Sequence, residues 1–243
     1  MITLENISLA YGSRLLLDNI SATFGTGTLT ALLGRNGTGK STLLRTIAAL
    51  QPAAAGRILA DGDDIRSLRP SERARRISFV TTDKVRIPNL TCREVAALGR
   101  APYTDWIGRL SDEDNAIVEQ ALAAVDMLSF AEKSMERLSD GECQRVMIAR
   151  ALAQQTPAIL LDEPTAFLDL PARYETVHLL HRLAREEGKT VIYSTHDLDT
   201  ALADSDCAAL LDTPKLICRT IDELRRCGDI ERIFGIVNTG MQK

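Results

Sequence analysis

The sequence predicts an α/β protein with a mainly parallel sheet, an antiparallel β portion near its N-terminus and a helical insert. Strand-like apolar runs alternate with segments of helical periodicity, which is typical of a parallel sheet covered by helices. Three candidate functional positions, Gly34, Asp162 and His196, each come directly after a strand-like run. Because the carboxyl ends of parallel strands meet at one edge of a sheet, we expect these positions to lie close together.

The composition is that of a folded protein rather than a disordered one. The 243 residues are 45% hydrophobic and 26% charged, with a formal net charge of -4. This suits one or two compact units with a sizeable core. The acidic balance lacks the overall basic footprint of a general nucleic-acid binder, although local basic patches remain possible.

The cysteines indicate neither a metal centre nor a disulfide framework. They lack Cys-x-x-Cys spacing and histidine neighbours, so reduced thiols of a cytosolic protein are expected: Cys92, Cys143, Cys207, Cys218 and Cys227. Residues 1–5 lack the pattern of a signal peptide, and no apolar run is long enough to span a bilayer. Any link to a membrane is therefore expected through a partner.

Two strand-like stretches, 2–9 and 15–24, flank a turn at Gly12 and Ser13 and predict an antiparallel start to the chain. Tyr11 lies at the edge of this turn, near in sequence to the glycine-rich stretch described next. A nucleotide base could stack on its ring. An ordinary half-buried tyrosine at a strand end is the alternative, and without further context it is the favoured interpretation.

The stretch 34–42 matches the P-loop pattern, in which a glycine, four residues and Gly-Lys-Ser join a strand to a helix. An apolar run, 29–33, precedes it, and a helix-like segment, 43–50, follows it. The glycines let backbone N–H groups surround a polyphosphate, and Lys40 adds a positive charge. The start of the helix offers further N–H donors, which leaves Ser41 to hold a magnesium ion.

Two further strands and a basic run follow the P-loop helix. Residues 57–60, with a turn at 61–62, predict one strand, and residues 77–80 predict another. A solvated helix face explains the basic run between them, because Asp64 and Glu72 are interleaved with its arginines. The run consists of Arg66, Arg69, Arg73, Arg75 and Arg76.

Helical periodicity dominates from about 83 to 155. Serine-led capping boxes at 111–114 and 139–142 each predict the start of a helix. The second of these starts is a potential anion site, although such a cap is ordinarily structural. Before them, 88–106 carries apolar and aromatic residues that fit either a local core or a surface for a partner.

A short apolar strand, 158–161, ends in Asp162 and Glu163. Two adjacent carboxylates at the end of a buried strand are costly unless they bind a cation or take part in chemistry. Beside a P-loop they fit two tasks, Asp162 in the shell of a magnesium ion and Glu163 next to the attacking water.

The last third of the chain continues the alternation of helices and strands. A helix predicted over 172–186 is stopped by Gly188 and leads to the strand 190–195. His196 follows this strand directly, and its place at the shared sheet edge favours a functional role over the structural one usual for a lone histidine. The end of the chain, 214–243, is expected to form a small α/β appendage.

Five motifs, in this order and spacing, give the chain a resemblance to an ATP-binding cassette (ABC) ATPase over essentially its whole length. They occupy 34–42, 138–142, 160–164, 168–169 and 194–197. The resemblance implies a single ABC ATPase domain over 1–243 with a RecA-like P-loop NTPase fold. Its nucleotide-binding core would comprise 1–82 and 156–243, and a helical subdomain with the family's signature segment would comprise 83–155.

The resemblance implies ATP and Mg²⁺ as cofactors. Tyr11 would stack on the adenine, and Lys40 would contact the β- and γ-phosphates. Ser41 and Asp162 would hold the metal. The positions that would bind the nucleotide within one chain are Tyr11, Gly34, Asn36, Gly37, Thr38, Gly39, Lys40, Ser41 and Thr42.

Catalytic roles are implied for Lys40, Glu163 and His196. Glu163 would act as general base or polarise the attacking water, and His196 would contact the γ-phosphate. Ser139 and Gly141, in the signature segment, would meet the γ-phosphate of ATP held by a second copy of the chain. The resemblance thus implies a homodimer that sandwiches ATP, in which Asp169 would join the two cassettes.

Two departures from the family's usual pattern affect the site. After the strand 77–80, Thr82 occupies the position of the usual glutamine, with Asp83 beside it. Either a water bridges from the shorter threonine to magnesium, or Asp83 takes over, or metal sensing is weaker. In the signature segment Asp140 and Glu142 add negative charge near a phosphate, which is unfavourable unless Glu142 turns back to the cap and Asp140 to solvent.

A narrower similarity concerns 98–103, Leu-Gly-Arg-Ala-Pro-Tyr, which is similar to subunits that energise import of iron-siderophores, haem and vitamin B12. It implies a peripheral protein on the cytoplasmic face of the cell membrane, bound to permease subunits and served indirectly by a substrate-binding protein. Leu90, Arg100, Tyr103 and Trp106 are expected to border a groove for a short cytosolic helix of the permease.

Two alternatives belong to other functional classes. A soluble ABC-type ATPase acting on nucleic acid or ribosomes usually adds a second cassette, long coiled-coil arms or a basic surface, none of which is seen in this sequence, so no nucleic acid is expected as a partner. A P-loop kinase would explain the stretch 34–42. It would leave the signature segment and His196 without a role.

Overall fold

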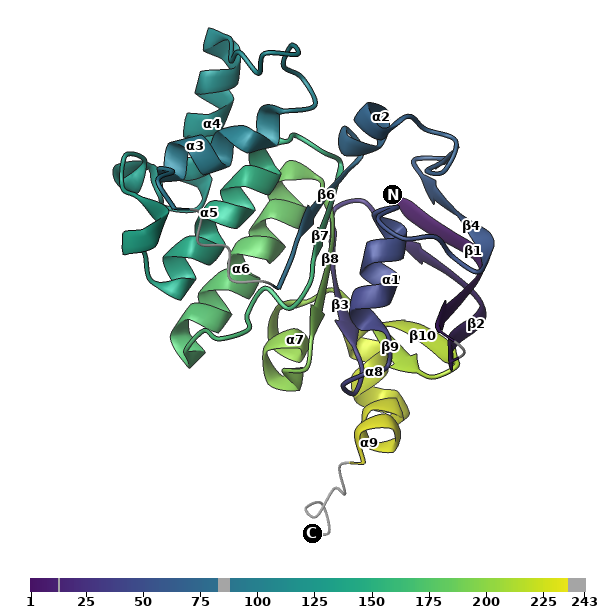
Figure 1. Cartoon of the computed structure of the whole chain (residues 1–243). Coiled ribbons are helices and arrows are strands. Elements are labelled where there is room, and N and C mark those ends of the chain that lie inside the picture. Colours follow the sequence, from purple (N-terminus) through teal and green to yellow (C-terminus); the bar gives the residue numbers. More distant parts are fainter. Residues whose placement is uncertain (13, 83–87, 236–243) are drawn as a thin grey trace.

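Two sheets organise the molecule, of which the computed structural model describes residues 1–12, 14–82 and 88–235 (Figure 1). The larger sheet consists of β3 (Thr28–Leu33), β6 (Ile77–Val80), β7 (Ala158–Leu161), β8 (Thr190–Thr195), β9 (Cys207–Asp212) and β10 (Lys215–Thr220). The smaller sheet consists of β1 (Ile2–Tyr11), β2 (Arg14–Phe24), β4 (Ala55–Ala60) and β5 (Asp63–Asp64).

The strand order confirms the predicted fold class. In the larger sheet the order is β10-β9-β3-β8-β7-β6, and every neighbouring pair is parallel except β9 and β10. The smaller sheet, in the order β2-β1-β4-β5, is antiparallel throughout. The mainly parallel sheet and the antiparallel N-terminal portion are both as the sequence predicts.

Helices lie on both sides of the larger sheet (Figure 1). They are α1 (Lys40–Ile47), α2 (Pro70–Ala74), α3 (Cys92–Ala97), α4 (Asp112–Ala124), α5 (Asp140–Ala153), α6 (Leu170–Glu187), α7 (Leu198–Asp204), α8 (Ile221–Cys227) and α9 (Asp229–Phe234). Three short 3₁₀ helices are η1 (Leu98–Arg100), η2 (Leu128–Phe130) and η3 (Met135–Arg137).

The central strands β3, β7 and β8 are buried on both faces, which explains the predominance of apolar residues in them. Along β7, Ile159 and Leu161 pack into the core that contains residues of α5 and α6. Leu160, between them, points into the second core, formed with α1 and the smaller sheet. Successive side chains of a strand point to opposite faces, so one short strand anchors both cores.

The predicted helical insert contains α3, α4 and α5, and both capping boxes form as expected. Ser111 accepts from the backbone N–H of Asp114, and Ser139 accepts from that of Glu142. Because α5 contacts β6 of the sheet as well as α3 and α4, the subdomain boundary near residue 155 stays a prediction.

Arg100 is buried, contrary to the expectation that it borders a groove for the permease. Only 5% of the residue is exposed. Its Nε donates to Oδ1 of Asp114 at 2.8 Å, and its Nη1 donates to the carbonyl of Ala153 at 2.8 Å. The guanidinium also lies 4.1 Å from the ring centre of Tyr103. Arg100 therefore joins η1, α4 and the end of α5.

The end of the chain is part of the larger sheet, which corrects the expected appendage over 214–243. β10 pairs with β9, and β9 pairs with β3. Ile221 and Leu224 of α8, together with Ile230 of α9, are buried in the same core as α6. Residues 236–243 of the predicted appendage lie outside the described residues.

Replacing Arg100 with alanine should strongly destabilise the helical insert. Asp114 would keep a buried charge without its partner, which typically costs about 3–5 kcal/mol of unfolding free energy. Chemical denaturation measures this loss. Arg93 is the matched control, because it pairs with Glu119 and Glu132 at exposed positions, and its alanine variant should lose about 1 kcal/mol or less. Equal losses for the two variants would contradict the structural role of Arg100.

Candidate active site

The P-loop connects the end of β3 to the start of α1 and leaves the helix N-terminus open. Gly37 and Gly39 have φ values of 76° and 103°, a backbone conformation that glycine adopts without strain. Gly39 precedes the first residue of α1, and no side chain caps the helix there. The first N–H groups of α1 are thus available to an anion. The helix starts at Lys40, three residues before the predicted start.

Lys40 is a buried cation that spans the P-loop. Its Nζ donates to the carbonyl of Gly34 at 2.8 Å and lies 3.8 Å from Oε1 of Glu163. Burial lowers the pKa of the Lys40 ammonium, and the nearby carboxylates of Glu163 and Asp162 oppose this shift. The negative charge of a polyphosphate would act in the same direction as the carboxylates.

Asp162 and Ser41 form an oxygen pair at the edge of the larger sheet. The hydroxyl of Ser41 donates to Oδ1 of Asp162 at 2.9 Å, and Asp162 is only 2% exposed. A hydroxyl and a carboxylate suit Mg²⁺, which protein sites commonly bind through one or two side chains plus phosphate oxygens. The described residues contain no cluster of three or more acidic, histidine or cysteine side chains fit for a metal. Nucleotide phosphates would have to complete this site.

Glu163 and His196 are in direct contact. Nδ1 of His196 lies 2.9 Å from Oε2 of Glu163, and the His196 side chain is 62% exposed. Glu163 has a φ of 48°, which is uncommon for a non-glycine residue and concentrates at functional sites. The carboxylate of Glu163 thus lies between the Lys40 ammonium and an exposed imidazole.

Ser194 is a site residue that the sequence interpretation left without a role. Its hydroxyl donates to Oδ1 of Asp162 at 2.7 Å and accepts from the backbone N–H of Glu163 at 2.7 Å. Ser194 belongs to β8, whose residues are all buried. A hydroxyl in a wholly buried strand needs polar partners, and this was the available signal.

Thr82 contacts the main chain of Asp162. Its hydroxyl donates to the main-chain carbonyl of Asp162 at 2.9 Å. A role of Thr82 as a magnesium ligand stays a prediction. The alternative ligand, Asp83, lies outside the described residues.

A pocket of about 430 Å³ lies over the P-loop and has the size of a small-molecule site. Seven predicted nucleotide-binding residues line it, together with Arg14, Leu16 and Glu163: Tyr11, Asn36, Gly37, Gly39, Lys40, Ser41 and Thr42. Gly34 and Thr38 instead make hydrogen bonds within the loop. The Gly34 carbonyl accepts from Lys40, and the Thr38 hydroxyl donates to the carbonyl of Arg35 at 2.8 Å. Tyr11 is 77% exposed, which favours the base-stacking interpretation over the half-buried alternative.

The signature residues do not share this pocket. Ser139 caps α5, and its N–H donates to Oε2 of Glu142 at 2.7 Å. This hydrogen bond is the main reason why the pKa of Glu142 is lowered. The Glu142 carboxylate thus turns back to the cap, as expected from the sequence. Among the described residues that line the pocket, neither Ser139 nor Gly141 occurs. Asp169 caps α6 by accepting from the backbone N–H of Ala172 at 3.0 Å.

The open helix N-terminus, the buried lysine and the carboxylates at the strand ends define a nucleotide-hydrolysing protein of the P-loop class. The family model described as ABC transporter matches residues 17–166. The chain belongs to this family and is an ATP-binding, ATP-hydrolysing cassette, which confirms the resemblance stated above. Tyr11, Asp169 and His196 lie outside the matched range.

Relatives in the same family are named as import proteins. A petrobactin import ATP-binding protein of Bacillus anthracis is 35% identical over 97% of this chain and 87% of its own length. An iron(3+)-hydroxamate import ATP-binding protein of Bacillus subtilis is 38% identical over 81% of this chain and 73% of its own. A cobalamin import ATP-binding protein of Halobacterium salinarum is 42% identical over 78% of this chain and 47% of its own. None of these names favours the nucleic-acid or ribosome alternative.

A solved cassette of an ABC transporter has a similar fold. It is 30% identical, with a TM-score of 0.78, and covers 91% of this chain and 99% of its own. That cassette was solved as a dimer in a post-hydrolysis state bound to ADP and phosphate. In the described part of the present chain, no helix has the length and apolarity required to cross a bilayer.

Replacing Ser194 with alanine should weaken metal binding more than nucleotide binding. Asp162 would lose one of its two hydroxyl donors, and loss of such a supporting contact costs about 10- to 100-fold in metal affinity or activity. We expect the Mg²⁺ concentration for half-maximal ATPase activity to rise by about this factor.

The matched control is Ser78, a serine of β6 that is 1% exposed and accepts from the Thr156 hydroxyl at 3.0 Å. The Ser78→Ala variant should keep the Mg²⁺ dependence of the unmodified protein. If Ser194→Ala also kept it, the supporting role of Ser194 would be wrong.

Proposed function

We propose that this chain energises the import of an iron chelate, haem or cobalamin through a membrane permease. Relatives named for the import of petrobactin, iron hydroxamates and cobalamin support the substrate class. The observation that carries the ATPase mechanism is the 2.9 Å contact of Glu163 with His196 beside Lys40.

In this proposal Glu163 receives a proton from the attacking water. The water oxygen bonds to the γ-phosphorus, the bond from that phosphorus to the bridging oxygen breaks, and phosphate leaves ADP. Lys40 and the N–H groups of the P-loop hold the phosphates in position, and His196 orients the Glu163 carboxylate on one side. A magnesium ion bound by Ser41 and Asp162 would neutralise charge on the β- and γ-phosphates.

The site would be completed by a second copy of the chain. Ser139 caps α5 and Gly141 lies in its first turn, and both are outside the nucleotide pocket of their own chain. In a dimer that sandwiches ATP, this helix N-terminus would face the γ-phosphate bound by the partner, and Asp169 would lie near the contact of the two cassettes. Closure around ATP and reopening after hydrolysis would then drive the permease between its states.

Replacing Glu163 with glutamine should leave ATP binding intact and lower turnover by about a hundredfold to ten-thousandfold, the range typical of a lost general base. The variant should also accumulate as an ATP-bound dimer. Nucleotide binding, phosphate release and size-exclusion chromatography measure these three effects. Glu136→Gln, at an exposed position of η3, serves as the control. Normal hydrolysis by Glu163→Gln would rule out the assigned role.

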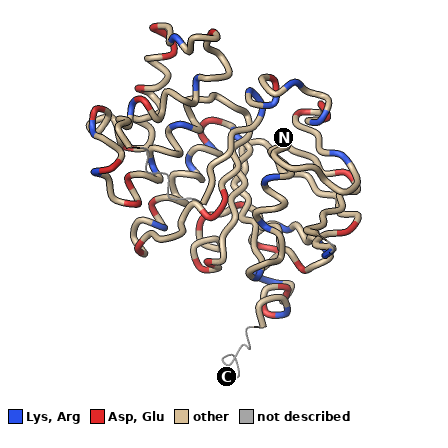
Figure 2. Tube along the Cα trace, in the orientation of Figure 1, with Lys and Arg blue, Asp and Glu red and all other residues tan. Residues whose placement is uncertain are grey.

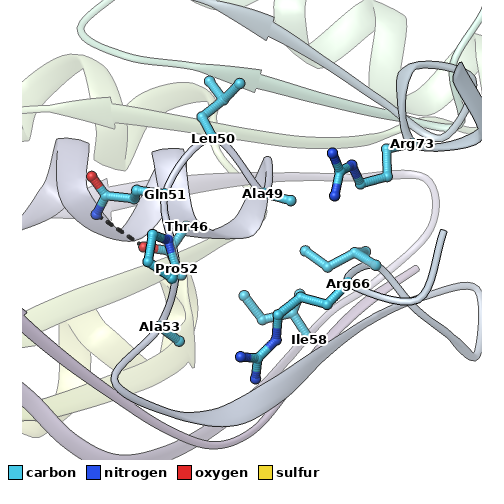
Figure 3. A pocket seen from close by; sticks show the side chains of 10 residues that line it. Thr46, Ala49, Leu50, Gln51, Pro52, Ala53, Ile58, Arg66 and Arg73 are labelled. Atoms are coloured by element: carbon cyan, nitrogen blue, oxygen red, sulfur yellow. Dashed lines mark hydrogen bonds between the residues drawn. The ribbon is translucent and has the colours of Figure 1, made fainter. Parts of the chain in front are cut away.

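A groove between α1, α2, η1 and α5 is the proposed contact for the permease. It has a volume of about 440 Å³, and its lining includes Leu50, Phe79, Leu98 and Gln154. A second pocket, of about 360 Å³, shares Ala49, Leu50 and Arg73 with it. Figure 3 shows Leu50 and Arg73 at this pocket, with Arg66 on its other side.

The lining of this groove revises the surface expected from the sequence. Arg100 is buried and therefore not accessible to a partner, whereas Leu90 is half-buried against the core and does not line the groove. Trp106 is 93% exposed, and it is not among the described residues that line either pocket. Figure 2 shows Lys and Arg positions around α2, where the basic run supplies Arg73 to the groove.

Replacing Leu98 with aspartate should uncouple the cassette from its permease. Leu98 is 51% exposed in the groove, so the isolated protein should keep its fold, its nucleotide affinity and its basal ATPase rate. Stimulation of ATPase activity by the reconstituted permease should be lost. Leu128→Asp, at a position that is 43% exposed in η2, is the control. Loss of ATP binding in Leu98→Asp would instead identify Leu98 as a core residue.

Localisation and cargo follow from the same proposal. The chain would lie on the cytoplasmic face of the membrane, held by the permease, with a substrate-binding protein delivering cargo from the other side. Purification from membranes together with the permease, followed by reconstitution, tests this. Stimulation of hydrolysis by a ferric siderophore, haem or a corrinoid would identify the cargo, and a cassette that copurifies with ribosomes would contradict the proposal.

A further inference from the structure

The nucleotide pocket contains a cation, Arg14, that has no partner among the residues that the structure describes. Of the positively charged residues lining it, Lys40 is buried, donates to the Gly34 carbonyl and lies 3.8 Å from Glu163. Arg14 is exposed, and its guanidinium makes no hydrogen bond or ion pair with any residue of 1–12, 14–82 and 88–235. The pocket thus offers an incoming anion a positive charge that no described side chain neutralises.

The β1–β2 hairpin directs this charge toward the pocket. Tyr11 and Arg14 are direct partners in the antiparallel ladder, and residues directly opposite each other project their side chains on the same face. Two residues further along β2, Leu16 approaches the P-loop so closely that a Cβ on Gly39 would lie 3.1 Å from Leu16 Cδ1. The hairpin is therefore packed against the P-loop, with Tyr11 and Arg14 at the same pocket.

The order of the lining residues indicates which part of a nucleotide Arg14 reaches. With the base on Tyr11 and the β- and γ-phosphates at Lys40, the ribose and the α-phosphate lie between these two residues. A guanidinium next to Tyr11 on the same hairpin faces that intermediate part. Of its groups, the α-phosphate is the charged one, and arginine forms charge-assisted hydrogen bonds to phosphate oxygens.

We propose that Arg14 binds the α-phosphate of the nucleotide. This rests on the nucleotide position proposed above, with the base on Tyr11. Arg14 then contributes equally to the binding of ATP, ADP and AMP, whereas Lys40 distinguishes nucleotides by their β- and γ-phosphates. Because Arg14 is exposed, its contribution weakens as the salt concentration rises.

The test compares Arg14→Gln with the unmodified chain in competition against a fluorescent ATP analogue. Affinities for ATP, ADP and AMP should each fall by the same factor, about tenfold, which corresponds to one modest charge-assisted bond. The affinity for adenosine should not change. Arg14→Lys, which keeps the charge, should recover part of the loss, and the difference between Arg14→Gln and the unmodified chain should shrink in high salt.

Arg137→Gln, an exposed arginine of η3, is the matched control and should bind all four ligands normally. A loss for ATP and ADP with unchanged AMP would place Arg14 at the β-phosphate and overturn the proposal. An equal loss for adenosine would place it at the ribose or base, and unchanged affinities would make it a solvated surface residue. Failure of the unmodified chain to bind ATP would refute the nucleotide site itself, a different result from any of these.

Discussion

The carboxylate of Asp162 makes the contacts on which the rest of the site depends. Its Oδ1 accepts hydroxyl bonds from Ser41 and Ser194, while its backbone N–H donates to Val80 and its carbonyl accepts from Thr82. The residue that directly follows β7 is thereby joined to α1, β8 and the end of β6. A carboxylate this deeply buried is stable only with such donors. The same bonds that make its burial tolerable also align the two oxygen ligands suited to magnesium.

The local part of this arrangement is predictable from the sequence, and the part that depends on strand neighbours is not. The P-loop, the capping box at Ser139 and the positions of Asp162 and His196 follow from short patterns with local causes. The contacts of Ser194 require that β8 lie beside β7, and no local pattern encodes that pairing. Arg100 was misplaced for a related reason, because its partner Asp114 comes from another helix and neutralises a charge that otherwise suggests a surface.

The C-terminal strand β10 shows a second limit of pattern reading. Its residues are half-buried or exposed without a regular alternation, because it is an edge strand in which Leu216 and Ile217 pack against different cores. The sequence therefore resembles an appendage, although β10 forms the edge of the larger sheet.

The acidic residues of the signature segment are more easily reconciled with the family's pattern. The carboxylate of Glu142 is held within the cap of α5, where it accepts a hydrogen bond from the Ser139 N–H and lies 3.8 Å from the Lys133 ammonium.

Helix α1 has one end at the nucleotide pocket and the other at the groove proposed as the permease contact. It is 8 residues long, about 12 Å at 1.5 Å per residue. Its first N–H groups lie at the nucleotide pocket, and Ala48, Ala49 and Leu50 directly beyond its last turn line the groove. Leu43, Leu44 and Ile47 are fully buried, so the helix is clamped along its length. The phosphate site and the groove therefore lie at opposite ends of one short helix, and a shift of α1 along its axis would move both together.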